Sequence, residues 1–161
     1  MNLTFSALVS IGNAESCSSE CPDGWSEFTL NDKSSCLMDT GVSAISSAAA
    51  KCASIGARLP LPLNQQHDTE MRNAFDSLGA GYVALDGNDN DDEGQWHKND
   101  GTAIGYFNWQ PGNPDNYNHD GVTESYLGTW KNGLWNDFGD ASAAIYDVHI
   151  VCQQNKPECG K

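Results

Sequence analysis

Two short clusters of carboxylate and amide side chains could bind a metal ion or a polar ligand. They are Asn113-Pro114-Asp115 and Trp135-Asn136-Asp137, and Glu124 lies between them in the sequence. Together they offer two side-chain amides and three carboxylates. Hard oxygen ligands of this kind suit one Ca²⁺ ion. The set contains no His or Cys, so it suits a softer metal poorly. Because it mixes hydrogen-bond donors and acceptors, the same set could also read the hydroxyl groups of a sugar.

A further group of acids crowds the segment that precedes these clusters. Like charges at this density repel one another unless a cation or solvent separates them. A solvated acidic turn is the expected explanation for Asp91 and Asp92, whereas Asp89 and Glu93 are better candidates for metal ligands.

The elements that must position these groups follow from the spacing of apolar residues. Helical spacing predicts one helix over residues 43–56 and a second over Asn64 to Leu78, closed by Gly79. Residues 86–125 form a long loop-rich segment, which is uncommon and usually functional. Strand-like runs occur near residues 25–30, 82–85, 125–130 and 149–152. A tight turn is expected at Asn132-Gly133, just before the second cluster. Two helices followed by strands and a long loop predict an α+β fold.

Composition limits the classes of partner. The chain has 161 residues, which fits one domain, and 39% of them are hydrophobic. The formal net charge is −14, from 22 acidic and 8 basic residues. This argues against nucleic acid, whose affinity depends on Lys and Arg, and against an anionic membrane surface. No stretch is long enough to insert across a membrane. An acidic chain concentrates cations such as Ca²⁺, and the alternative is that the acidity serves solubility alone.

The cysteines indicate an oxidising compartment. There are six of them, an even number without CxxC pairs, which favours three disulfides over a zinc site but leaves the pairing open. We therefore expect a secreted or extracellular protein. The apolar run Leu3 to Ile11 is short and lacks a basic flank, so it is a poor signal peptide; a remnant of one and an N-terminal strand are the alternatives.

The ordered set of motifs resembles the C-type lectin-like domains, over roughly residues 21–153. Asn113-Pro114-Asp115 stands where that family has Glu-Pro-Asn or Gln-Pro-Asp, and Trp135-Asn136-Asp137 matches its Trp-Asn-Asp. The other matching pieces are Cys21-Pro22-Asp23-Gly24-Trp25, Tyr82-Val83-Ala84-Leu85, Glu93-Gly94-Gln95-Trp96 and Asp100-Gly101. The resemblance implies an α+β fold of two helices, small antiparallel sheets and a long calcium-binding loop region. Aromatic and turn residues become denser from Cys21, which places an N-terminal extension at 1–20, the lectin-like domain at 21–153 and a tail at 154–161.

The resemblance further implies the disulfide pairs Cys21–Cys36 and Cys52–Cys152. A second family disulfide near the long loop is missing, because Tyr126 and Asp140 stand at its positions. Two additional cysteines flank the domain. Since the termini run side by side in this fold, a Cys17–Cys159 bridge is predicted, with an interchain bond as the alternative.

Two calcium sites are implied by the resemblance. The principal site takes its ligands from Asn113, Asp115, Glu124, Asn136 and Asp137, with Asp120 as a competitor for the role of Glu124. The auxiliary site would use Asp89, Glu93 and Asn116, and would share Glu124.

In this family, two vicinal sugar hydroxyls complete the shell of the principal calcium. The amide-then-carboxylate order of Asn113 and Asp115 has the polarity of galactose binders, although Asn is one methylene shorter than Gln. The carbohydrate-binding set is then those five calcium ligands together with Tyr117, whose ring could stack on galactose. An ordinary exposed loop aromatic is the alternative for Tyr117, and Trp130 is expected to be core rather than a sugar platform.

These observations predict a secreted, calcium-dependent lectin for glycans of the galactose or N-acetylgalactosamine type. The alternatives are mannose-type specificity, or a structural, matrix or ice-binding protein on the same fold. An enzyme has little support, because no nucleophile–base pair or acid couple stands out. Single open sugar sites are weak, so useful avidity predicts a homo-oligomer, with residues 1–20 as a possible joining segment.

Overall fold

The fold consists of three α-helices and six strands in the part of the chain that the computed structural model describes, residues 19–117, 121 and 123–159. The strands are β1 (Ser26–Leu30), β2 (Lys33–Val42), β3 (Tyr82–Asn88), β4 (Tyr126–Thr129), β5 (Trp135–Phe138) and β6 (Val148–Asn155). The helices are α1 (Ala48–Ala53), preceded by the 3₁₀ turn η1 (Ile45–Ser47), α2 (Gln65–Leu78) and α3 (Asp140–Ile145).

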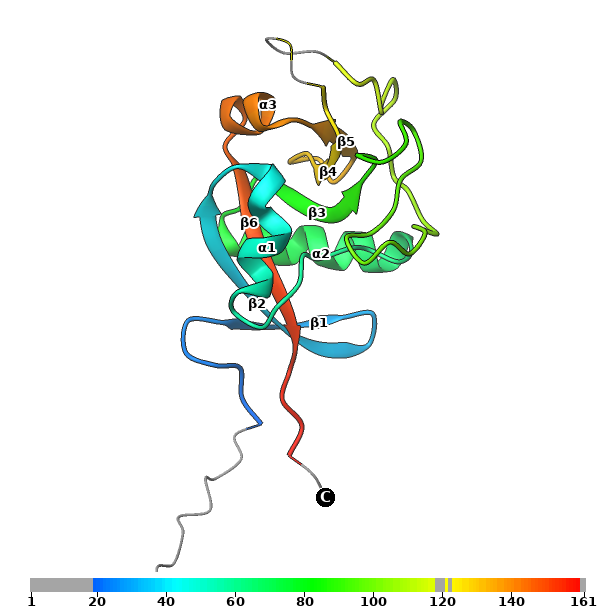
Figure 1. Cartoon of the computed structure of the whole chain (residues 1–161). Coiled ribbons are helices and arrows are strands. Elements are labelled where there is room, and N and C mark those ends of the chain that lie inside the picture. Colours follow the sequence, from blue (N-terminus) through cyan, green and yellow to red (C-terminus); the bar gives the residue numbers. More distant parts are fainter. Residues whose placement is uncertain (1–18, 118–120, 122, 160–161) are drawn as a thin grey trace, which may run out of the picture.

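All six strands join one sheet in the order β1-β2-β6-β3-β4-β5 (Figure 1). Neighbouring strands are antiparallel except β3 and β6, which run parallel. The last strand therefore lies in the middle of the sheet and separates the N-terminal hairpin, β1 and β2, from β3, β4 and β5. The long segment between β3 and β4 lies at the end of the molecule away from the β1–β2 hairpin.

The predicted α+β class is confirmed, with differences in detail. Helix α2 lies where it was predicted, because the Asn64 side chain accepts a hydrogen bond from the His67 backbone N–H at its start and Gly79 closes it with a φ of 79°. Helix α1 is shorter than the predicted 43–56. The short helix α3 was not predicted, and one mixed sheet replaces the expected small antiparallel sheets.

The sheet has a hydrophobic core on each face. Along β3, Val83 and Leu85 pack with α2, whereas Ala84 packs with α1 and α3, because successive side chains of a strand point to opposite faces. In the same way, Trp135 and Phe138 at the two ends of β5 belong to different clusters. The residues between them, Asn136 and Asp137, are therefore held in a strand that is fixed on both sides.

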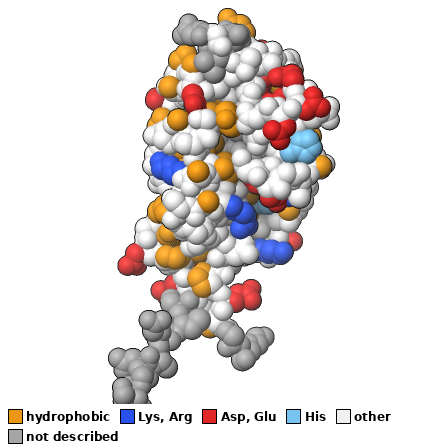
Figure 2. Space-filling view, viewed as in Figure 1, with side chains coloured by type: hydrophobic (Ala, Val, Ile, Leu, Met, Phe, Trp, Pro, Cys, Tyr) orange, Lys and Arg blue, Asp and Glu red, His pale blue; other side chains and the backbone are white. Residues whose placement is uncertain are grey.

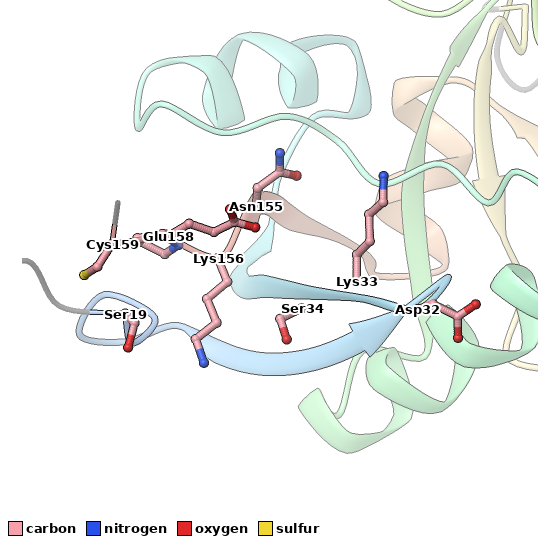
Figure 3. A pocket seen from close by; sticks show the side chains of 9 residues that line it. Ser19, Asp32, Lys33, Ser34, Asn155, Lys156, Glu158 and Cys159 are labelled. Atoms are coloured by element: carbon pink, nitrogen blue, oxygen red, sulfur yellow. The ribbon is translucent and has the colours of Figure 1, made fainter. Parts of the chain in front are cut away.

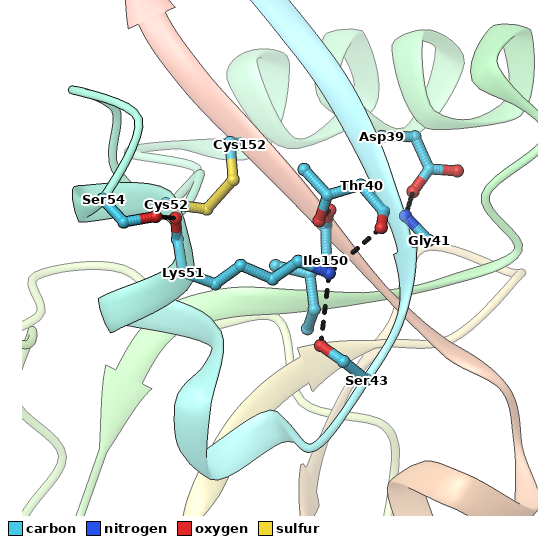
Figure 4. Close-up of a disulfide and its surroundings, with 9 residues drawn as sticks. All are labelled: Asp39, Thr40, Gly41, Ser43, Lys51, Cys52, Ser54, Ile150 and Cys152. Atoms are coloured by element: carbon cyan, nitrogen blue, oxygen red, sulfur yellow. Dashed lines mark hydrogen bonds between the residues drawn. A yellow bond between two sulfur atoms is a disulfide. The ribbon is translucent and has the colours of Figure 1, made fainter.

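Two disulfides connect the elements of the described chain. Cys52 of α1 is bonded to Cys152 of β6, and Cys21 is bonded to Cys36 of β2. Beside the first of these, the Lys51 ammonium donates to the Thr40 carbonyl oxygen at 3.0 Å and fastens α1 to the end of β2 (Figure 4). These are the two pairs that the family resemblance implied. The third predicted pair, Cys17–Cys159, includes Cys17, which lies outside the described residues.

Asp140, at one of the two positions of the missing family disulfide, is held by hydrogen bonds to another segment. The Asp140 carboxylate at the start of α3 accepts bonds from the Ser46 backbone N–H at 2.9 Å and from the Ser46 hydroxyl at 2.6 Å. Helix α3 is thereby joined to η1 on the same face of the sheet. The segment that follows β5 is held here by hydrogen bonds instead of a covalent bond.

A buried carboxylate, Asp68 of α2, connects the helix to the long loop and to β5. It accepts hydrogen bonds from the Trp135 indole N–H at 3.1 Å, the Asn108 amide at 2.6 Å and the Tyr106 hydroxyl at 3.2 Å. Burial raises the pKa of Asp68, against the opposing effect of these donors. Burial and the nearby carboxylate raise the pKa of Tyr106 to about 12. These bonds position the strand that carries Asn136.

Gly128 of β4 is required by a close approach, and its replacement gives a testable prediction. A β-carbon at this position would lie 2.7 Å from the Phe138 ring and 3.2 Å from the Val83 carbonyl oxygen. We expect Gly128→Ala to destabilise the protein by about 1–3 kcal/mol, because the ring must move in a packed core. Urea unfolding measures this change.

Gly105→Ala is the matched control, since no atom lies within 4 Å of the corresponding β-carbon. Equal stability of the two variants would contradict this account of the packing.

No helix in the described chain combines the length and apolar character needed to cross a membrane.

Candidate functional site

Three carboxylates converge at the end of the molecule where the long segment meets β5. Oxygen atoms of Asp115, Glu124 and Asp137 all lie within 4.8 Å of one another. Glu124 is 4% exposed and Asp137 is completely buried, whereas Asp115 is exposed. The arrangement therefore has two buried carboxylates at its base and one at its rim.

Backbone donors hold the innermost carboxylate in place. The two oxygens of Asp137 accept hydrogen bonds from the Asp115 N–H at 3.2 Å and the Asn116 N–H at 2.6 Å. The Asn113–Pro114 peptide bond just before these donors is cis. Asp137 thereby connects β5 to the segment that carries the first cluster.

The two amides of the predicted ligand set also lie together. The Asn113 side-chain amide donates to the Asn136 side-chain oxygen, and the Asn136 amide donates to the Asp137 carbonyl oxygen. Strands β4 and β5 are paired, with Gly128 opposite Asn136. The structure therefore brings together all five residues that were predicted for the principal calcium site.

The electrostatics of this cluster favour a cation. Burial raises the pKa of the Asp137 carboxyl, the backbone N–H donors oppose the shift, and the neighbouring Asp115 charge adds to it. A buried carboxylate is costly unless it is paired or coordinates a metal, and three neighbouring negative charges repel one another.

The carboxylate cluster faces a hollow of about 370 Å³. Tyr117 lines it from the long segment, Trp130 directly follows β4, and Tyr146 directly follows α3. The remaining lining residues are Gln110, Asn113, Asp115, Glu124 and Asn136. The side chains predicted to bind calcium and several aromatic rings therefore line one open cavity.

The residues predicted for the auxiliary site form an adjoining group. The Asn116 amide donates to Glu93 at 2.7 Å, and the Asn116 side-chain oxygen accepts from the Glu124 N–H at 3.1 Å. Desolvation and the charge of Asp89 raise the pKa of Glu93. One oxygen of Asp89 accepts from the Gly94 N–H at 2.9 Å, and the other is buried without a hydrogen-bond partner. A buried carboxylate oxygen of this kind is available to a cation.

Sequence reasoning missed part of the cavity wall. Gln110 and Tyr146 were not considered, and Trp130 was expected to be core. Trp130 does pack with Phe138, at 6.0 Å between ring centroids, but it also lines the cavity. No spacing in the sequence signals Tyr146, because it directly follows a helix, α3, that was not predicted. The candidate ligand Asp120 lies outside the described residues.

The surface around the site is acidic. Asp91, Asp92 and Glu93 are all exposed on the segment that follows β3. Acidic side chains gather on the upper right of the molecule, over this segment (Figure 2). Such a surface attracts cations to the site.

A larger hollow, of about 680 Å³, lies at the opposite end of the molecule, near the chain termini (Figure 3). Its charged lining residues are Asp32, Lys33, Lys156 and Glu158. Charges of both signs stand there, and the Lys156 ammonium is paired with Glu27 at 2.8 Å. This hollow lacks the converging oxygen ligands of the carboxylate cluster.

The donor set of the carboxylate cluster fits calcium. It consists of carboxylate and amide oxygens alone, which hard cations prefer, and two of its carboxylates are buried. Asp115, Glu124, Asp137, Asn113 and Asn136 are the residues that would hold such an ion. A bound Ca²⁺ would offset two of the three negative charges and would supply a Lewis-acidic centre at the base of the cavity.

The mixed six-stranded sheet, the helices on its two faces and the long segment beside β5 define the C-type lectin-like fold. The structure superimposes with a TM-score of 0.69 on the human scavenger receptor C-type lectin carbohydrate-recognition domain, at 24% identity, covering 84% of this chain and 99% of that one.

Sequence relatives agree with the fold. Perlucin of Haliotis laevigata is 29% identical over 140 residues, which cover 84% of each chain. The mannose-binding protein of Gallus gallus is 28% identical over 102 residues, and the match spans 63% of this chain but 37% of that protein. No family model matches the chain. The chain therefore has the C-type lectin-like fold and is similar in sequence to these two proteins.

Proposed function

We propose that this protein is a calcium-dependent carbohydrate-binding lectin. The observation that carries the proposal is the convergence of Asp115, Glu124 and Asp137 within 4.8 Å at the base of an open cavity. Asp115, Glu124 and Asp137 would hold the ion and accept hydrogen bonds from two vicinal hydroxyls of a sugar, and the amides of Asn113 and Asn136 would donate to these hydroxyls. The ion would supply Lewis-acid coordination of the same hydroxyls. Asp89, Glu93 and Asn116 are proposed to hold an auxiliary ion beside this site.

A galactose-type ligand is the proposed specificity. Asn113 offers an amide and Asp115 a carboxylate, in the order described for galactose binders. The Tyr117 ring is 57% exposed and lines the same cavity, and it is the proposed stacking surface for the apolar face of a sugar. Mannose-type specificity is the competing outcome of a binding test.

The proposed setting is extracellular and oligomeric. Two disulfides in the described chain suit an oxidising compartment. The cavity is open and buries little of a monosaccharide, so one site is expected to bind on the order of millimolar. Several sites on one assembly would supply avidity. Light scattering of the purified protein tests the assembly, and a monomer alone would contradict it.

The decisive experiment is affinity chromatography on immobilised galactose and immobilised mannose. We expect retention on galactose in millimolar Ca²⁺ and elution with EDTA. Retention on mannose alone would replace the galactose assignment. Failure to bind any glycan on an array in the presence of Ca²⁺ would overturn the proposal and favour a structural or ice-binding role on the same fold.

Calcium affinity is expected to fall in acid. The pKa values of Asp137 and Glu93 are raised from the ordinary carboxyl values, by burial and by neighbouring charges. Because these pKa values are raised, protons compete with calcium at a higher pH than they would at an exposed carboxylate. Calcium affinity is therefore full above the raised pKa values and is lost as the pH falls through them. Calcium titration calorimetry between pH 4 and 8 measures this dependence, and undiminished affinity near pH 4, the ordinary carboxylate range, would contradict it.

A further inference from the structure

A second hollow adjoins the candidate sugar cavity, and one residue, Tyr146, lines both. This second hollow has a volume of about 360 Å³. Tyr82 and Lys131 are among the other residues of this second hollow. The two hollows therefore adjoin at Tyr146.

Tyr146 stands in a group of aromatic rings that holds it in place. Its ring centroid lies 4.9 Å from that of Trp130, with the planes at 63°, and 5.7 Å from that of Tyr82. Phe138, one residue after the candidate ligand Asp137, lies 6.3 Å from Tyr146. Packing on several sides limits the rotamers that Tyr146 can adopt, so a ligand that contacts it would lose little side-chain entropy on binding.

The short helix α3 explains how this ring reaches the site. It begins at Asp140, soon after β5, and the Asp140 carboxylate binds Ser46 of η1. Tyr146 follows the last residue of α3, and its backbone N–H bonds the Ser142 carbonyl oxygen at 3.1 Å. The ring position is therefore fixed by the same segment that leads away from the carboxylate cluster.

The surface chemistry of this junction suits a sugar. Rings of Tyr and Trp offer apolar faces that pack against C–H groups, together with polar tips that can bond hydroxyls. Trp130, which lines the first cavity, has an indole N–H that is buried without a hydrogen-bond partner. The Lys131 ammonium lies 5.2 Å from the centre of the Tyr82 ring and gives the second hollow a cationic side chain.

We infer that this protein binds a glycan of at least two sugar residues, with the terminal residue in the carboxylate cavity and the next residue packed on Tyr146 at the entrance to the second hollow. The inference rests on the proposed function, because it assigns the direction of the chain that leaves the same site. Tyr146 is on this account a specificity-determining residue for the second sugar. The ligand class is then an oligosaccharide rather than a free monosaccharide.

The test compares matched pairs of sugars by calorimetry in saturating Ca²⁺. Methyl β-galactoside is compared with lactose, and methyl α-mannoside with an α-linked mannose disaccharide. For the preferred terminal sugar we expect the disaccharide to bind about three- to tenfold tighter than the monosaccharide, the gain typical of one aromatic contact. Equal affinity of monosaccharide and disaccharide would overturn the inference while leaving the proposed function intact.

Three variants test whether Tyr146 is responsible for the tighter binding of the disaccharide. Tyr146→Ala is expected to bring the ratio of the two affinities close to one, whereas Tyr146→Phe, which keeps the ring, retains most of it. Tyr146→Leu keeps apolar volume in the aromatic group and serves if the alanine variant unfolds. A calcium titration of each variant reports on the carboxylate cluster separately.

The outcomes distinguish failure of the Tyr146 inference from failure of the proposed lectin function. A disaccharide preference that persists in both Tyr146→Ala and Tyr146→Leu would overturn the role of Tyr146. Calcium binding without binding of any sugar would end the proposed function, and the inference with it.

Discussion

Asp137→Asn is expected to lower calcium affinity by about 100-fold, because it removes one of three converging carboxylate charges, and calcium affinity depends steeply on the number of charged ligands. The change also replaces one carboxylate oxygen with an N–H₂ group that faces the backbone N–H of Asp115 or Asn116. Titration calorimetry measures the affinity directly. In thermal unfolding, calcium should raise the melting temperature of the unchanged protein and have little effect on the variant.

Two further variants make this result interpretable. Asp115→Asn removes a carboxylate of the same cluster that is exposed, so it should weaken calcium binding with less effect on the apo fold. Asp91→Asn removes one exposed negative charge from the neighbouring segment without entering the cluster, and should leave the affinity within about twofold, as expected for a screened surface charge. Equal losses in Asp91→Asn and Asp137→Asn would mean that net charge, not the cluster, binds the ion. Full calcium binding by Asp137→Asn would remove the basis of the proposed function.

Removal of the Cys52–Cys152 disulfide is expected to have the largest effect on stability. The bond closes a loop with a sequence separation of 100 residues, so it restricts the unfolded chain strongly. The chain-entropy relation gives a loss of about 4–5 kcal/mol for the double variant Cys52→Ala/Cys152→Ala, before any repacking of these two buried positions. Denaturant unfolding under oxidising conditions measures the change.

The second disulfide supplies the comparison. Cys21–Cys36 closes a loop with a sequence separation of 15, so its removal as Cys21→Ala/Cys36→Ala should cost less, about 3 kcal/mol. A larger loss from the short loop than from the long one would show that packing at these sites, not loop closure, dominates. Both double variants should retain calcium binding when folded, because none of these cysteines belongs to the carboxylate cluster.

Local features of the fold were predictable from adjacent residues. Helix α2 was placed correctly because its hydrophobic spacing and its two caps, Asn64 and Gly79, all lie within one continuous stretch of sequence. The short helix α3 was missed because six residues rich in Ala and Ser carry little periodic signal. It is stabilised by tertiary contacts, among them the bonds between Asp140 and Ser46.

The sequence by itself determined the chemistry of the candidate site: an oxygen-only set of amides and carboxylates, an acidic surface and an aromatic residue beside them. It could not determine their distances, because Asp115 and Asp137 come from separate segments whose meeting depends on strand register and on packing of both sheet faces. The tertiary structure decided that Asp137 is completely buried while Asp115 is exposed, and that Tyr146 borders the same cavity. Ligand chemistry is a property of each side chain, whereas burial and proximity arise only when the whole chain has packed.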